Sequence, residues 1–312
     1  MEFDLENPLT DSQDLNSDSV ASLFLTESDH MPSQNYFSSL QAGDFDVLVR
    51  REATASISQF SCNLDPLLSY LAVNYLDRFL SCHLMTQPEQ WVIKLLAISC
   101  VSLAAKMKKA EFSLTYFQDE GGIIFDTRTI GRMEALILGA LKWRMRSITP
   151  FSFIPFFISQ FKPQDPLLRQ ALKARAVEII FKAQNDINFF AYKPSIVAAS
   201  ALLCASHELF PLQFPCFRKA LSNCLYLNKE SMSQCYNAVQ AVVLEEYESV
   251  SEAISSSVTP VNVLDQRFSS SESGNTNGKS TVTTLRIESD IKRRKISHYC
   301  HNRTVQISQF GQ

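Results

Sequence analysis

Glycine is scarce in this sequence: only 8 of its 312 residues are glycine. That scarcity argues against a sheet-rich fold and against a glycine-rich loop that cradles phosphate. Sustained alternation of apolar and polar residues is also missing, and no Asn-Gly pair joins two apolar runs as a hairpin turn would. The chain therefore contains few of the features that mark β-strands.

Long apolar runs and paired cysteines are missing too. No uninterrupted apolar run reaches about 18 residues, so we expect no membrane span. The first residues, 1–4, read MEFD, which is unlike a secretory signal or a transit peptide. The 8 cysteines form no Cys-x-x-Cys pair and lie mostly inside apolar runs. We expect reduced thiols in a cytosolic or nuclear protein.

Basic residues are missing from the first 49 positions, which hold ten acidic residues. The net charge is +4 over residues 50–248 and +3 over 249–312, so the total of −3 is unevenly distributed. The middle section is too weakly basic for a nucleic-acid-binding domain, and we expect no direct nucleic-acid contact. The acidic composition predicts a largely disordered leader over 1–46. A short amphipathic helix near 19–25 is an open alternative to disorder within this leader.

Helical periodicity covers most of residues 47–248. Helices are predicted over 47–61, 65–82, 89–108, 127–142, 151–161, 167–189, 194–209, 213–223 and 229–248. Several begin near a proline, where the missing N–H costs little. Asp126 and Asn228 are expected to cap the helices that follow them.

Two of these helices contain a long stretch without any charged residue, 95–105 in one and 195–206 in the other. A helix that is apolar on every side is typical of a central helix surrounded by others. We therefore predict an all-α protein with two tandem five-helix folds, 47–146 and 147–248, each built around one central helix. The two tryptophans are expected to be core or helix-packing residues.

The last section, 249–312, is rich in serine and polar residues, and it cannot bury enough apolar surface to offset chain entropy. We expect a disordered regulatory tail that is a target for phosphorylation. Its basic run, Lys292, Arg293, Arg294 and Lys295, is either a solvated charge run or a nuclear import signal. The potential metal ligands at 298–301 have no structural zinc spacing, and we expect no metal site and no cofactor.

Two charged residues lie on apolar helix faces. Lys106 closes the uncharged stretch of its helix, and Glu134 lies among Ile130, Met133 and Ile137. An unpaired buried charge is costly, so each needs a partner or access to solvent. The two either pair with each other or reach water, or they point outward and bind another protein. Periodicity alone does not decide.

Several segments, in a fixed order along the chain, resemble one protein family. Residues 71–81 (LAVNYLDRFLS) are similar to the second helix of a cyclin box, and 103–107 (LAAKM) to the end of its third. Residues 132–134, 141–145 and 149–153 are similar to the fifth helix and the link to a second fold. The sequence most resembles plant D-type cyclins, and its 2–9 and 261–265 segments resemble their sixth subgroup.

This resemblance implies roles for five residues. Arg50 and Asp77 would form an internal ion pair, and Leu95 would belong to the core of the cyclin box. Lys106 and Glu134 would hydrogen-bond to a kinase. No Ser/His/Asp or Cys/His set for catalysis is present in a plausible order.

The sequence also departs from the family pattern. Glu52 and Ser56 make the first helix more polar than the substrate-docking groove of other cyclins, and Lys108 and Lys109 stand where many cyclins have acidic residues. The Leu-x-Cys-x-Glu motif of D-type cyclins is missing, so we expect no high-affinity docking of a pocket protein by that route.

The resemblance predicts a non-catalytic regulatory subunit that binds and activates a cyclin-dependent Ser/Thr kinase and promotes the G1/S transition and cell division. The alternatives are a pseudo-cyclin that binds a kinase without activating it and a cyclin-fold transcription factor. Kinase-inhibitor proteins are candidate further partners. We expect the nucleus as the main location, with the cytoplasm as a second one.

Overall fold

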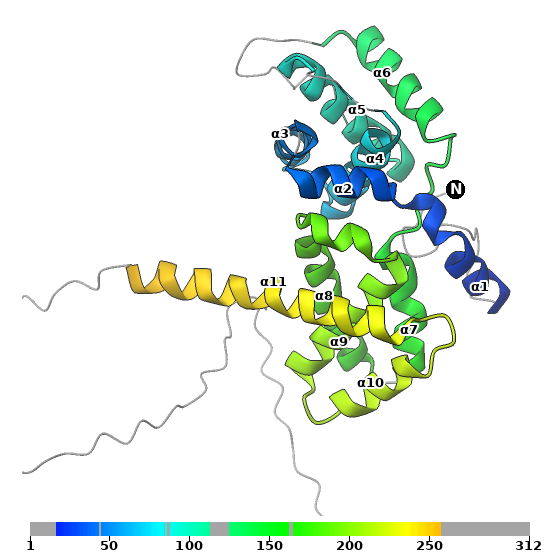
Figure 1. Cartoon of the computed structure of the whole chain (residues 1–312), viewed down its shortest axis with the longest axis vertical. Coiled ribbons are helices and arrows are strands. Elements are labelled where there is room, and N and C mark those ends of the chain that lie inside the picture. Colours follow the sequence, from blue (N-terminus) through cyan, green and yellow to red (C-terminus); the bar gives the residue numbers. More distant parts are fainter. Residues whose placement is uncertain are drawn as a thin grey trace, which may run out of the picture. The chain divides into compact units, whose positions relative to one another are not determined.

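Helices are the only regular elements in the computed structural model, which describes residues 17–43, 45–83, 85, 88–112, 125–161 and 165–256 (Figure 1). The predicted all-α class is therefore confirmed. The α-helices are α1 (Ser17–Thr26), α2 (Gln34–Ala42), α3 (Phe45–Phe60), α4 (Pro66–Cys82), α5 (Gln90–Lys108), α6 (Thr127–Ala140), α7 (Ile154–Phe161), α8 (Pro166–Ala183), α9 (Pro194–Leu209), α10 (Phe214–Ser222) and α11 (Lys229–Ser256). Short 3-10 turns span Glu27–His30, Pro150–Phe153 and Ile187–Ala191.

The helices start where the sequence provides caps. Asp65 accepts a hydrogen bond from a backbone N–H in the first turn of α4, and Pro66 follows it at the first helical position. The two predicted caps are confirmed: Asp126 accepts from the first turn of α6, and Asn228 accepts from the backbone N–H of Ser231 at the start of α11.

In the first fold, α5 is the central helix and packs against α3, α4 and α6 (Figure 1). Its small and apolar side chains, among them Ala97, Cys100 and Ala104, have no exposed surface. Within the described residues, α5 is also the one helix long and apolar enough to cross a membrane, but 67% of that window is buried inside the protein. Its apolar character is explained by its position in the core.

In the second fold, α9 is the central helix and packs against α7, α8, α10 and α11 (Figure 1). Ala198, Ala201 and Leu202 are fully buried there. The two uncharged stretches of the sequence thus mark the two central helices, as predicted.

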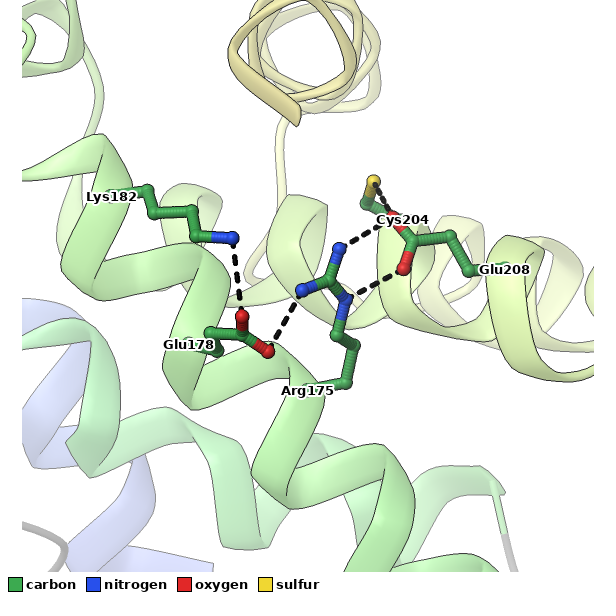
Figure 2. Close-up of polar contacts among 5 residues, drawn as sticks. All are labelled: Arg175, Glu178, Lys182, Cys204 and Glu208. Carbon is green, nitrogen blue, oxygen red and sulfur yellow. Dashed lines mark hydrogen bonds and ion pairs between the residues drawn. The ribbon is translucent and has the colours of Figure 1, made fainter. Parts of the chain in front are cut away.

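An ion-pair cluster fixes α8 to α9 (Figure 2). Arg175 on α8 donates to both carboxylate oxygens of Glu208 on α9, at 2.6 and 3.2 Å. It also pairs with Glu178, which accepts from Lys182 one turn further along α8. Beside Glu208, burial raises the pKa of the Cys204 thiol to about 12, so this thiol stays protonated. These contacts hold the central helix in place and leave no reactive nucleophile.

The expectation of disorder over 1–46 is wrong for residues 17–43, which form α1, a 3-10 turn and α2. Val20, Leu23 and Phe24 of α1 are buried in the core of the second fold, where the Phe24 ring stacks on Tyr226 with centroids 4.5 Å apart. Leu40 of α2 is buried in the core of the first fold. The leader folds because its few apolar residues, spaced for one helix face, are buried by both folds.

One acidic residue of the leader has a structural role. The buried Glu27 carboxylate accepts from the backbone N–H of Ser195 at 2.9 Å and from its hydroxyl at 3.0 Å, in the first turn of α9. Burial raises the pKa of Glu27, while these bonds and nearby Lys193 oppose that rise. The carboxylate therefore satisfies an N–H that would otherwise lack a partner at the start of the second central helix.

Candidate functional site

The structure brings Arg50 and Asp77 together inside the first fold. The Arg50 guanidinium on α3 donates to both oxygens of the Asp77 carboxylate on α4, at 2.8 and 3.1 Å. Both side chains are buried. Burial alone would lower the pKa of Arg50, but the Asp77 carboxylate outweighs burial and raises it. This bidentate pair ties the first helix of the fold to the second.

The same guanidinium reaches the second fold. Arg50 Nη2 also donates to the backbone carbonyl of Gln184 at 3.1 Å, and the Gln184 amide donates back to the carbonyl of Tyr70 at 2.9 Å. The Phe190 ring lies 5.0 Å from the Arg50 guanidinium. Arg50 is therefore a structural residue that joins both folds.

Lys106 and Glu134 are also brought together, but near the surface. Lys106 at the end of α5 donates from Nζ to both carboxylate oxygens of Glu134 on α6, at 2.6 Å each. The Lys106 side chain is 60% exposed, whereas that of Glu134 is 10% exposed. The pair thus combines a fixed, nearly buried carboxylate with an ammonium group that faces solvent.

An open groove of about 610 Å³ lies next to this pair. It is assembled from the leader, the end of α5, the end of α6 and the segment that follows α6. Its lining residues are Ser22, Thr26, Asp29, His30, Met107, Leu138, Trp143, Arg144, Met145 and Arg146. Met107 directly follows Lys106 on α5, and Leu138 is one helical turn beyond Glu134 on α6, so the groove and the pair are carried by the same two helices.

Trp143 was predicted to be a core or helix-packing residue, and that prediction is wrong. Its side chain is 73% exposed at the groove. Lys142 and Trp143 have φ angles of 52° and 61°, a left-handed conformation that is costly for residues with a side chain. This turn ends α6 and places the indole at the groove. Trp91, also predicted to pack, is 43% exposed.

Positive charge gathers at the leader end of the groove. Arg78 is buried and donates to the hydroxyl of Ser147 at 2.8 Å, while Arg144 pairs with Asp29 at 2.9 Å. Between these groups, burial and then the charges of Arg78 and Arg144 lower the pKa of His30 to about 4, against a smaller opposite effect of Asp29. His30 is therefore neutral at physiological pH.

The lowered pKa of His30 predicts how stability depends on pH. Between about pH 6.5 and 4 the unfolded state binds a proton at His30 that the native state does not, so the free energy of unfolding should fall as the pH is lowered through this window. With solvent screening we expect a loss of about 2 kcal/mol from this residue. Urea denaturation at pH 7, 5.5 and 4 should show a shallower decline for His30→Gln than for the wild type. Parallel declines would contradict the assignment.

The remaining predicted positions lie elsewhere. Leu95 is buried between α5 and α6, in contact with the cluster of Ile98 and Ile130. Ser56 is buried, and its hydroxyl donates to the backbone carbonyl of Glu52 within α3. Lys109 ends α5 in a left-handed conformation. Lys292, Arg293, Arg294 and Lys295 lie outside the described residues, as does all of the chain from residue 257 onward.

No group of three or more His, Cys, Asp or Glu side chains within the described part of the chain could hold a metal ion. The candidate site is an apolar groove with a Lys–Glu pair beside it and arginines in its lining, an arrangement suited to docking a partner. The pairing of Lys106 with Glu134 and the position of Trp143 could not be read from the sequence pattern.

Comparison with known proteins gives two family matches in tandem. The profile described as "Cyclin, N-terminal domain" matches residues 18–146, and "Cyclin, C-terminal domain" matches residues 148–271. The first match begins within α1, so the matched domain includes the leader helices α1 and α2, which precede the predicted first fold.

Similar proteins agree with these matches. An Arabidopsis thaliana protein named "Putative cyclin-D6-1" is 48% identical over 95% of this chain and 99% of its own length. "Cyclin-D6-1" of Oryza sativa subsp. japonica is 39% identical over 94% of this chain and 90% of its own length. The crystal structure of a viral cyclin from herpesvirus saimiri has the same fold, with a TM-score of 0.54 at 21% identity, over 72% of this chain and 97% of the viral one.

Proposed function

The chain belongs to the cyclin family as a plant D-type cyclin, and from that premise we propose that it binds and activates a cyclin-dependent Ser/Thr kinase to promote the G1/S transition and cell division. Members of this family are regulatory subunits that partner with such kinases and are not themselves enzymes. The proposed activity is therefore exerted through binding alone.

The observation that supports this proposal best is the Lys106–Glu134 pair beside the apolar groove, in which the Lys106 side chain is exposed. A lysine ammonium has three donors, and the carboxylate does not use all of them. Lys106 can thus donate to a partner's backbone carbonyl while Glu134 holds it in place. Each carboxylate oxygen of Glu134 has a further lone pair for a partner's N–H. The internal pair and the partner contact are compatible.

Activation then follows from selective binding. A protein kinase is active only when a glutamate of its αC helix pairs with the lysine of strand β3. A rigid surface that binds the active placement of that helix better than the inactive one shifts the kinase population toward activity. The groove, with Met107, Leu138 and Trp143, provides apolar contact, and the Lys106–Glu134 pair provides hydrogen bonds that fix the register.

Kinase binding should depend on both members of the pair. Since a hydrogen bond to a charged group contributes roughly 1.5–3 kcal/mol, Lys106→Ala and Glu134→Ala should each weaken binding on the order of 10-fold or more. The measurement is co-purification with candidate kinases followed by titration. Lys219→Ala, an exposed lysine on α10, is the matched control and should bind like the wild type. Equal recovery of all four proteins would contradict the proposal.

A pseudo-cyclin that binds without activating is the second candidate, because Glu52 and Ser56 alter the first helix of the fold. A kinase assay on the purified complex separates the two. Phosphorylation of a histone or pocket-protein substrate above the level of the free kinase supports the activator. Binding without this increase supports the pseudo-cyclin.

We also propose a mainly nuclear location, supported by the basic run Lys292, Arg293, Arg294 and Lys295. Kinase-inhibitor proteins are further proposed partners. The missing Leu-x-Cys-x-Glu motif leaves no basis for pocket-protein docking by that route.

A further inference from the structure

One ion pair at the groove is largely exposed to solvent. Arg144 Nη1 donates to Asp29 Oδ2 at 2.9 Å, and the two side chains are 50% and 56% exposed. Asp29 belongs to the leader and Arg144 to the segment after α6, and both line the groove. An ion pair exposed to this extent contributes little to stability, because water stabilises the two separated charges almost as well as the pairing does. A better-placed carboxylate could therefore replace Asp29.

The surroundings of this pair have a surplus of positive charge. Buried Arg78 donates to the neutral hydroxyl of Ser147, and no ion pair of Arg78 is present among the residues that the structure describes. Burial and then the charges of Arg78 and Arg144 lower the pKa of His30, so its imidazole is neutral at physiological pH. Arg144 thus pairs with the Asp29 carboxylate, whereas buried Arg78 donates to a neutral hydroxyl. This end of the groove favours an additional or a stronger anion.

The apolar lining of the groove restricts which class of ligand could provide that negative charge. Met107, Leu138 and Trp143 line it with apolar surface, and Trp143 is largely exposed. A free inorganic anion would leave this apolar surface in contact with water, and a nucleic-acid backbone would need more cations than this end provides. A protein helix with an apolar face and one acidic side chain at its edge would cover the apolar surface and neutralise the arginines together.

We propose that the kinase segment seated in this groove carries an Asp or Glu carboxylate that displaces Asp29 and binds Arg144. This inference rests on the proposed function and adds one requirement for the kinase: an acidic side chain on the segment that lies in the groove. Asp29 acts as an internal competitor: it pairs with Arg144 in the free protein, and this ion pair breaks when the kinase carboxylate binds Arg144. Kinases without an acidic side chain at that position would bind more weakly, so the exchange contributes to partner choice.

An exchange predicts effects of opposite sign for the two partners of the pair. With the full-length chain and a kinase identified by co-purification, Arg144→Gln should weaken binding about 5- to 20-fold. Asp29→Asn should tighten it about 2- to 5-fold, because it removes the competitor. The double variant should bind like Arg144→Gln, since without Arg144 there is nothing to compete for. Arg218→Gln, an exposed arginine on α10, is the matched control and should not change the dissociation constant.

The alternative is a pair that only holds the leader against the first fold. In that case Arg144→Gln and Asp29→Asn would weaken binding alike and lower the melting temperature alike, and this result would overturn the exchange. Unchanged or weakened binding in Asp29→Asn overturns it as well. If Lys106→Ala and Glu134→Ala lose binding while the Arg144 and Asp29 variants keep wild-type affinity, the exchange fails and the proposed function stands. If Lys106→Ala and Glu134→Ala bind like the wild type, the proposed function itself fails.

Discussion

Replacing Arg50 with alanine is expected to lower the free energy of unfolding by about 3–5 kcal/mol, because it leaves the buried Asp77 carboxylate without its counter-charge. The guanidinium donates to both Asp77 oxygens and to the Gln184 carbonyl, so its loss removes three hydrogen bonds and one link between the folds. For a protein with about 200 folded residues this corresponds to a drop in melting temperature of roughly 10 °C. Thermal unfolding followed by circular dichroism measures it.

Two further variants show whether the charge is the cause. Arg51→Ala removes the neighbouring arginine, which is exposed on α3, and should change the free energy of unfolding by no more than about 0.5 kcal/mol. Replacing both partners, as Arg50→Met with Asp77→Leu, should cost less than Arg50→Ala alone, since no buried charge is then left unpaired. An equal loss in Arg50→Ala and Arg51→Ala would show that the contacts of Arg50 do not stabilise the protein.

The sequence predicts the helices well because their start signals and periodicity are local. Asp126 and Asn228 cap as expected, and the two uncharged stretches become the two central helices. Composition averages over the leader and predicts that it is largely disordered, with a short helix near 19–25 as an open alternative that α1 now confirms. Val20, Leu23 and Phe24 show the spacing of a helix face, and this local signal outweighs the ten acidic residues around it. One of those acids, Glu27, is itself buried as a cap.

The docking site is less predictable because it is assembled from distant segments. Lys106 and Glu134 stand out in the sequence as charges on apolar faces, but only the packing of α5 against α6 brings them to 2.6 Å. Trp143 was predicted to be a core or helix-packing residue. Its exposure follows from two consecutive left-handed residues that no glycine marks in the sequence. Asp29 and Arg144 are 115 positions apart, and no periodicity connects them.

Exchanging the charges of the Lys106–Glu134 pair should abolish kinase binding while preserving the fold. Lys106→Glu alone places two carboxylates side by side and removes the donor, so we expect binding to weaken by more than about 100-fold. The double variant, Lys106→Glu with Glu134→Lys, restores an opposite-charge pair between α5 and α6. Its melting temperature should lie closer to that of the wild type than the melting temperature of Lys106→Glu does.

The double variant matters because its two readouts separate the two roles of the pair. If the pair served only to join α5 to α6, restoring opposite charges would restore binding along with stability. If a partner binds the pair directly, the double variant has donor and acceptor in exchanged positions. A kinase carbonyl that accepts a hydrogen bond from the Lys106 ammonium in the wild type would then lie beside a carboxylate, which cannot donate. Affinity would then stay more than about 100-fold below the wild type although stability recovers. Titration of the folded double variant with the kinase decides between these outcomes, and recovery of wild-type affinity would remove Lys106 and Glu134 from the kinase interface.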